Sequence, residues 1–114
     1  MVTTQQRRNT AMKLLSNSFN VKPNVVKISV ANTLSHEIAK LIKVYELIKD
    51  GKQVVTEAIF VGGGRADIFN LDDMQVFEIL HSEKEAEALK KKDKYPQEVE
   101  IFLLFADEVI KDGN

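Results

Sequence analysis

The amino-acid sequence predicts a mixed α/β domain of the α+β kind, with helices packed on a mixed sheet. Three observations predict this class. A strongly amphipathic stretch over residues 33–49 is typical of a helix. Three β-like runs follow it closely enough to form an antiparallel meander, and a further helix-like stretch then precedes an apolar run suited to a central strand. A chain of 114 residues can bury one hydrophobic core and is too short for two domains.

The composition excludes several classes of protein. With 44% hydrophobic and 29% charged residues, the chain has the balance of an ordinary globular domain. Its apolar runs are only a few residues long, so we expect no membrane span, and no signal-peptide pattern opens the sequence. The absence of cysteine excludes disulfides, a thiol nucleophile and a cysteine-based zinc site. We therefore expect an intracellular, cytoplasmic protein.

The net charge of −1 conceals an uneven distribution. Residues 1–52 carry nine Lys or Arg against three Asp or Glu, whereas residues 53–114 carry seven against fourteen. A basic half could follow the phosphates of a nucleic acid, and an acidic half could hold a cation. The alternative is two solvated surfaces of opposite sign.

The N-terminal stretch 5–19 predicts a first helix, because apolar and small residues recur there at helical spacing: Ala11, Leu14, Leu15, Ser18 and Phe19. Its basic residues lie outside this stripe and could either bind phosphate or form a solvated face: Arg7, Arg8 and Lys13. Residues 25–30 fit a short strand or an extended linker equally well. We therefore divide the single domain into an N-terminal helical arm, 1–31, and a core, 32–114.

The second helix, over 33–49, is the strongest in the sequence. Three polar residues can cap its start: Asn32, Thr33 and Ser35. It ends at Asp50-Gly51, where glycine suits the left-handed exit of a helix. One face of this helix is apolar and is formed by Leu34, Ile38, Leu41, Tyr45 and Ile48, with Ile42 and Leu47 widening it.

The three β-like runs cover 53–61, 65–70 and 74–80. The glycines at 62–64 join the first two runs as a hairpin turn. Three successive glycines could also suggest a phosphate-binding loop. However, a strand follows instead of a helix, and no Lys-Ser or Lys-Thr pair is present, so the sequence favours the turn.

A third helix is predicted over 82–92, since Ser82 and Glu85 have the spacing of a capping box. Tyr95-Pro96 interrupts it. The apolar run 99–105 then suits a central strand, and 106–111 a short last helix.

Acidic residues stand in the middle of two predicted strands, at Asp67 and Glu78. Strand interiors disfavour acidic residues, and a buried carboxylate without a partner is costly. Because hairpin pairing can bring the two side chains to about 5 Å at Cβ, a shared divalent cation would explain both. Glu57, in the first strand, and Glu37, in the first turn of the second helix, could join them. Carboxylates completed by water suit Mg²⁺ or Mn²⁺.

Taken in order, these motifs resemble the PD-(D/E)xK nuclease superfamily, to which restriction endonucleases and archaeal Holliday-junction resolvases belong. The resemblance covers about residues 33–105 and consists of short motifs, each on the expected element. His36-Glu37-Ile38-Ala39-Lys40 resembles the helix motif with its acid, and Val54-Val55-Thr56-Glu57 the first strand. Arg65-Ala66-Asp67 is similar to the Arg-x-Asp variant of the "PD" element, and Phe77-Glu78-Ile79 begins the "(D/E)xK" element. Ser82-Glu83-Lys84 and the stretch 90–95 resemble the helix that follows.

The resemblance implies a restriction-endonuclease-like αβββαβ core with an extra N-terminal helix, and a metal-dependent DNA endonuclease that hydrolyses phosphodiester bonds. By the resemblance, Mg²⁺ or Mn²⁺ would be bound by Asp67, Glu78 and the Ile79 carbonyl, with Glu37 assisting through water. The position of Glu57 in the first strand makes it a candidate for a further ligand. Basic side chains would contact DNA, including branched or junction DNA: Arg7, Arg8, Lys13 and Arg65. So small a core covers little DNA, so we expect a homodimer, with the first helix as dimer contact or DNA arm.

One departure from the family pattern concerns catalysis. The family lysine that stands two residues after the glutamate, and that positions the attacking water, is replaced by Leu80. Four residues are candidates to supply its function: Lys84, Lys91, His36 and His81. Without a substitute, the chain would be a catalytically degenerate relative that binds nucleic acid or acts as a scaffold. A plain protein-interaction domain that uses Leu14, Leu15 and Phe19 is a third class.

Overall fold

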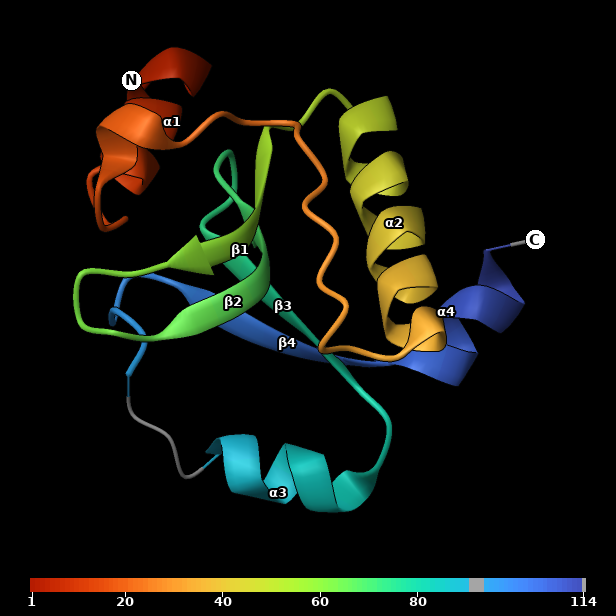
Figure 1. The fold of residues 1–114 in the computed structure, drawn as a ribbon. Coiled ribbons are helices and arrows are strands. Elements are labelled where there is room, and N and C mark those ends of the chain that lie inside the picture. Colours follow the sequence, from red (N-terminus) through yellow and green to blue (C-terminus); the bar gives the residue numbers. More distant parts are fainter. Residues whose placement is uncertain (91–93, 114) are drawn as a thin grey trace.

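The fold is a four-stranded mixed sheet with helices on both faces, as a computed structural model describes it for residues 1–90 and 94–113 (Figure 1). The strands lie in chain order across the sheet: β1 (Val54–Ile59), β2 (Arg65–Asn70), β3 (Gln75–Leu80) and β4 (Glu100–Phe105). β1, β2 and β3 pair antiparallel, and β4 lies parallel to β3. The predicted mixed α/β class is therefore confirmed.

The helices divide between the two faces of the sheet. α2 (Leu34–Lys49) and α4 (Ala106–Asp112) cover one face, and α1 (Thr4–Met12) lies on the other side (Figure 1). α3 (Glu83–Lys90) forms the crossover between the parallel strands β3 and β4, and the short 3₁₀ helix η1 (Ser18–Asn20) follows α1. Within the described ranges, no helix has the length and apolar character needed to cross a membrane.

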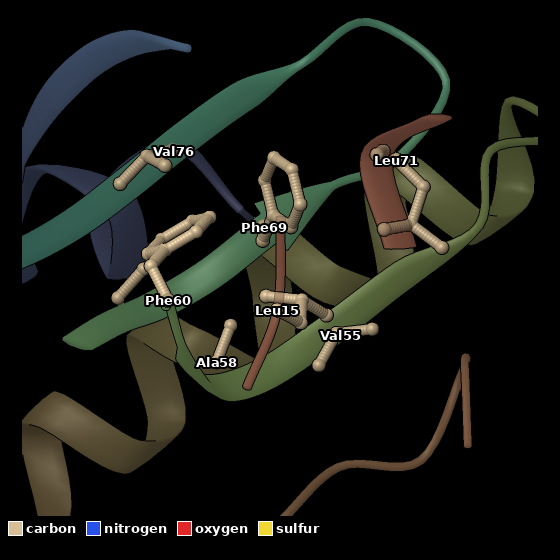
Figure 2. Close-up of a cluster of buried hydrophobic side chains, with 9 residues drawn as sticks. Leu15, Val55, Ala58, Phe60, Phe69, Leu71 and Val76 are labelled. Carbon is tan, nitrogen blue, oxygen red and sulfur yellow. The ribbon is translucent and has the colours of Figure 1, made fainter. Parts of the chain in front are cut away.

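Each face of the sheet carries its own hydrophobic core. Under α2 and α4, buried side chains include Val44, Val54, Ile68 and Ile79. On the opposite face, Phe60 and Phe69 pack edge to face with ring centroids 5.0 Å apart, surrounded by aliphatic side chains (Figure 2). This second cluster includes Leu15, so the N-terminal segment closes the second core.

The first helix is shorter than predicted, since α1 ends at Met12 instead of continuing to Phe19. Beyond α1 the backbone pairs with the edge of the sheet: Leu15 forms a β-bridge with Phe60, Ser16 N–H donates to the Ile59 carbonyl at 2.8 Å, and Val61 N–H donates to the Leu14 carbonyl at 3.0 Å. These bonds take the place of further helical turns. Phe19 consequently lies exposed rather than on a buried stripe.

α2 exposes most of the face that its apolar pattern predicts to be buried, although Leu47, which widens that face, is buried as predicted. The face predicted from sequence is largely exposed, with relative exposures of 76% at Leu34, 51% at Leu41 and 64% at Tyr45. The side toward the sheet instead buries polar residues together with a few apolar ones: His36, Glu37, Ala39, Lys40, Val44 and Leu47. The physical reason is that the ionic and hydrogen-bonding partners of Lys40 and Glu37, apart from each other, lie on β1 and on the linker before α2.

The segment before α2 is an extended linker, which decides between the two alternatives for residues 25–30. It lies along β1 through side-chain hydrogen bonds. Thr56 Oγ1 donates to the Val25 carbonyl at 2.8 Å and accepts the Lys27 N–H at 2.9 Å. Thr33 then caps α2 by accepting the His36 N–H. The linker therefore positions the start of α2 relative to the sheet.

Arg8 joins α1 to the turn after β2 through a two-pronged ion pair. Its Nε and Nη2 lie 2.8 and 3.0 Å from the two carboxylate oxygens of Asp72. Asp72 is buried and also accepts the Gln53 N–H. Burial alone would raise the pKa of Asp72, but Arg8 and the Gln53 N–H lower it below its ordinary value. Of the basic residues predicted to contact DNA, Arg8 is therefore occupied within the fold.

We predict that Arg8→Ala lowers the melting temperature by several degrees, whereas Arg7→Ala, at the exposed neighbouring position, changes it little. The low pKa of Asp72 means that the stabilisation is present above the pKa of an unfolded aspartate and is lost as the pH falls below it. Thermal unfolding followed by circular dichroism at neutral and acidic pH would check both statements. Equal melting temperatures for the two variants would contradict this account.

Candidate active site

Acidic side chains from three adjacent strands form one row across the sheet. The pairs Thr56–Ile68 and Ala58–Ala66 leave Glu57 across from Asp67, and the pairing of β2 with β3 ends at Ile68–Phe77, just before Asp67 and Glu78. Beyond that pair, the Ile79 N–H donates to the Asp67 carboxylate at 2.8 Å instead of to a backbone carbonyl of β2. Asp67 therefore lies where β2 and β3 separate, beside Glu78.

Glu78 is the most perturbed acid of the row. Only 8% of the residue is exposed, and this burial, with the adjacent Asp67 carboxylate second, raises the pKa of Glu78 to about 8. Two neighbouring carboxylates resist simultaneous ionisation in a buried site. Near neutral pH, Glu78 is thus largely the protonated member of the pair.

The hydroxyl group of Tyr95 connects β2 to Glu78. The Tyr95 hydroxyl contacts the Arg65 carbonyl at 2.7 Å and also the Glu78 carboxyl group. A hydroxyl has one hydrogen, and a carbonyl oxygen can only accept. The Tyr95 hydrogen is therefore shared between the two oxygens, and its hydrogen bond to Glu78 lowers the pKa of that carboxyl, an effect that burial and Asp67 outweigh. Burial, followed by Glu78 itself, raises the pKa of Tyr95, so the phenol stays neutral.

Tyr95 is held in this position by packing and by a glycine. Its ring stacks edge to face on Phe60, with centroids 5.7 Å apart. A Cβ on Gly64 would come within 2.6 Å of the Lys94 carbonyl oxygen, so only glycine lets the backbone before Tyr95 approach the β1–β2 turn this closely. Gly63, with φ of 96°, supplies the left-handed turn residue. The glycine run therefore serves the turn, and it also positions Tyr95.

His36 approaches the pair from the start of α2. Its Nε2 lies 3.3 Å from Asp67 Oδ2. Its Nδ1 is buried, finds no hydrogen-bond partner among the described residues, and is 4.0 Å from Glu37 Oε1. His36 therefore contacts the Asp67 carboxylate from the first turn of α2.

A second ionic group, centred on Lys40, adjoins the first. The Lys40 side chain is fully buried, and its Nζ lies 2.5 Å from Glu37 Oε2, 2.6 Å from the Lys27 carbonyl and 3.7 Å from Glu57 Oε1. Burial alone would raise the pKa of Glu37, but Lys40, Asn32 and the Ser29 N–H together lower it. Glu37 and Lys40 therefore form a buried ion pair that fixes α2 to β1.

The backbone conformation of Glu57 places its carboxylate in this second group. Its φ of 51° is left-handed, which is unusual for a residue inside a strand. Glu57 Oε1 faces Lys40, and its Oε2 lies 3.9 Å from Arg65 Nε. Glu57 is thus shared between two cations and is less available as a ligand than Asp67 and Glu78.

Glu78 opens into a hollow of about 240 Å³ between the β1–β2 turn and α3. Two basic residues, Arg65 and Lys94, line it together with Tyr95. A second hollow, about 430 Å³, lies against Lys94 and Tyr95 as well and adds Lys13. Among the described residues, the basic side chains that line these two hollows are Arg65, Lys94 and Lys13.

The remaining predicted residues lie in other places. Lys84 is exposed on α3, Arg7 is exposed on α1, and His81 is exposed with its Nε2 3.0 Å from Thr33 Oγ1. Lys91 lies outside the described residues. In the described part of the chain, no three His, Asp or Glu side chains converge closely enough to enclose a metal ion by themselves. The acids that the structure brings together are the pair Asp67 and Glu78.

Sequence reasoning placed Lys40, Lys94 and Tyr95 within motifs of the resemblance but assigned them no role at the site. For Lys40, the available signal was its position three residues after Glu37, which places both on one side of a helix. For Tyr95 and Lys94 the signal was weak, since they reach Glu78 only through the fold of the segment between α3 and β4.

We predict that Glu78→Gln removes a pH dependence from folding stability. The pKa of Glu78 is raised above the ordinary value of 4.5, so the folded protein keeps a proton that the unfolded chain releases. The free energy of unfolding of the natural protein should therefore fall as pH rises from about 5 to about 8. Urea unfolding across this range should show a flatter profile for Glu78→Gln. Parallel profiles would contradict a protonated Glu78.

None of the family models, curated proteins or solved structures compared with this chain matches it. The family resemblance therefore rests on the motifs given above. The functional conclusion below depends on the geometry around Asp67 and Glu78.

Proposed function

We propose that this protein is a Mg²⁺- or Mn²⁺-dependent DNA endonuclease that hydrolyses phosphodiester bonds at Asp67 and Glu78. One observation carries the proposal: the two carboxyl groups lie side by side where β2 and β3 separate, and Glu78 keeps a proton that a cation would replace. The pair is thus suited to binding positive charge. The proposal includes the cytoplasmic location and the homodimer expected from the sequence.

The donors at this site fit a magnesium ion. Mg²⁺ typically takes one or two carboxylates and completes its shell with water and substrate phosphate oxygens, so a closed cage of protein ligands is unnecessary. Asp67 and Glu78 would hold the ion, and Glu57 would stay with Lys40 and Arg65. When bound, the ion would supply an activated water and stabilise charge at phosphorus.

The surrounding residues have roles that follow from their positions. Arg65 and Lys94, beside the hollow that Glu78 lines, would bind the phosphate group. His36, at 3.3 Å from Asp67, would orient that carboxylate. Tyr95, whose hydroxyl donates to Glu78 and contacts the Arg65 carbonyl, would hold the ionised Glu78 carboxylate in place.

The order of elements also supports this proposal. A helix, an antiparallel meander, a second helix and a strand parallel to β3 follow one another as the nuclease resemblance implies, with α1 as the additional N-terminal helix. We propose on this basis that the fold is restriction-endonuclease-like. Within it, Asp67 and Glu78 occupy the two acid positions of the motif.

A catalytically degenerate DNA-binding protein is the second candidate, and Leu80 favours it. Leu80 is 7% exposed and takes the place of the family lysine. The buried cation Lys40 follows Glu37, the motif acid of α2, by three residues. Its ammonium group, however, is held by Glu37, Glu57 and the Lys27 carbonyl. Such a protein would bind DNA in a salt-sensitive way without hydrolysing it.

We predict that plasmid, single-stranded DNA or a four-way junction is cut in Mg²⁺ or Mn²⁺ and left intact in EDTA. Asp67→Asn and Glu78→Gln should each lower the cleavage rate at least about a hundredfold. Glu87→Gln, an exposed acid on α3, is the matched control and should retain activity. Gel-shift binding with no cleavage in either metal would support the degenerate protein, and cleavage undiminished by both site variants would exclude this mechanism.

We also predict that metal binding displaces the Glu78 proton. The affinity for Mn²⁺ should rise by up to about tenfold per pH unit below the pKa of Glu78, with release of one proton. The chain has two tyrosines and no tryptophan, so Tyr45→Phe leaves Tyr95 as its only fluorescent tyrosine. Titrating this variant with Mn²⁺ and with Mg²⁺ at several pH values follows the site without a cleavage assay. An affinity that is independent of pH, or that is unchanged by Glu78→Gln, would argue against a metal at this carboxylate.

A further inference from the structure

The outer side of α2 is an exposed apolar surface. The helix buries its polar side against the sheet, and its other side faces away from the sheet (Figure 1). The extended linker before α2 adds two further exposed apolar residues at its edge. We call the whole surface the α2 face; it comprises Ile28, Val30, Leu34, Ile38, Leu41, Tyr45 and Ile48.

The spacing within the helical part of this face is that of a helix-pairing seam. From Leu34 to Ile48 the apolar residues follow intervals of four, three, four and three, which is the heptad pattern of two helices that pack along each other. No charged residue interrupts the seam. A second helix of the same kind would therefore meet apolar side chains along its full length.

The α2 face is large enough for a stable dimer. Its seven residues have relative exposures between 37% and 99%. At about 200 Å² for each large apolar residue, they expose roughly 800 Å². A monomer seldom exposes an apolar patch above about 600 Å², and a standard interface buries about 800 Å² on each partner. The α2 face thus matches one half of such an interface.

The two ends of the face are complementary to each other. At the start of α2, a hollow of about 370 Å³ is lined by Ile28, Val30 and Leu34, among others. Toward the other end, Tyr45 stands out with 64% of its surface exposed. An antiparallel partner with its two-fold axis between Ile38 and Leu41 would bring Tyr45 of each copy over the other's hollow. Self-complementary halves of this kind are what a two-fold interface requires.

We propose that two copies of this chain associate through the α2 face, with their α2 helices antiparallel. Ile38 then packs against Leu41 of the other copy, Leu34 against Tyr45, and Ile48 reaches toward Val30. A second copy is favoured over an unrelated partner because the seam, the hollow and the projecting tyrosine are all on one face of one chain. This inference is independent of the nuclease proposal, and it places the dimer contact on α2 instead of on the N-terminal helix.

Sedimentation equilibrium across a wide concentration range tests the association. The natural chain, 12.9 kDa as a monomer, should reach twice that mass. Leu41→Glu, which places charge in the seam, should weaken association more than about thirtyfold while keeping its helical circular dichroism. Phe19→Glu, at an exposed aromatic residue near the N-terminus, is the matched control and should remain dimeric. A natural chain that stays monomeric, or a dimer that only Phe19→Glu disrupts, would overturn the proposal.

Cysteine cross-linking tests the antiparallel arrangement in folded protein. Because the chain has no cysteine, each introduced thiol is unique. A mixture of Leu34→Cys and Tyr45→Cys chains should form a mixed disulfide on mild oxidation. Either variant alone should form little, since the antiparallel register separates its own two thiols by about 16 Å along the helix axis. Strong cross-linking of each variant to itself, with none between them, would overturn the arrangement.

Discussion

The buried ammonium group of Lys40 determines how α2 lies on the sheet. A charged group without water requires compensating partners, and those of Lys40 are Glu37, Glu57 and the Lys27 carbonyl. They come from α2, β1 and the linker. This ion pair can form only when the polar side of α2 is turned inward. The same rotation brings His36 to Asp67 and leaves the α2 face in contact with water.

The two ionic groups at the site differ in how far their charges are balanced. Around Lys40, the opposite charges are in place and the hydrogen bonds are numerous. Around Asp67 and Glu78, balance depends on the Glu78 proton and on His36. The first group therefore supports the fold, and in our proposal the second exchanges its proton for a metal ion. This difference is why the proposed chemistry is assigned to Asp67 and Glu78 and not to Glu37 and Glu57.

Much of the fold could be predicted because its signals are local. The alternation in 65–70 and 74–80, with a short connection between them, predicts the hairpin, and the register of that hairpin brings Asp67 beside Glu78. The end of α1 could not be predicted, because Leu15 leaves the helix to pair with Phe60, a residue distant in sequence. The orientation of α2 was equally hidden: apolar periodicity identifies the apolar side of a helix, but only tertiary contacts decide whether a buried ion pair takes the inner position.

The arrangement of α2 links the two proposals through one element. His36, Glu37 and Lys40 lie on its inner side, and the seam centred near Leu41 lies on its outer side. Exposing this apolar surface does not stabilise an isolated domain. If α2 carried no ion pair, burying its apolar side on the sheet would be the more stable arrangement. Exposure is instead a consequence of placing an ion pair beside the carboxylates. A second copy that covers the α2 face would remove this apolar surface from water and leave the inner side unchanged. The ion pair could then stay on the inner side of α2 without leaving an apolar outer side in water.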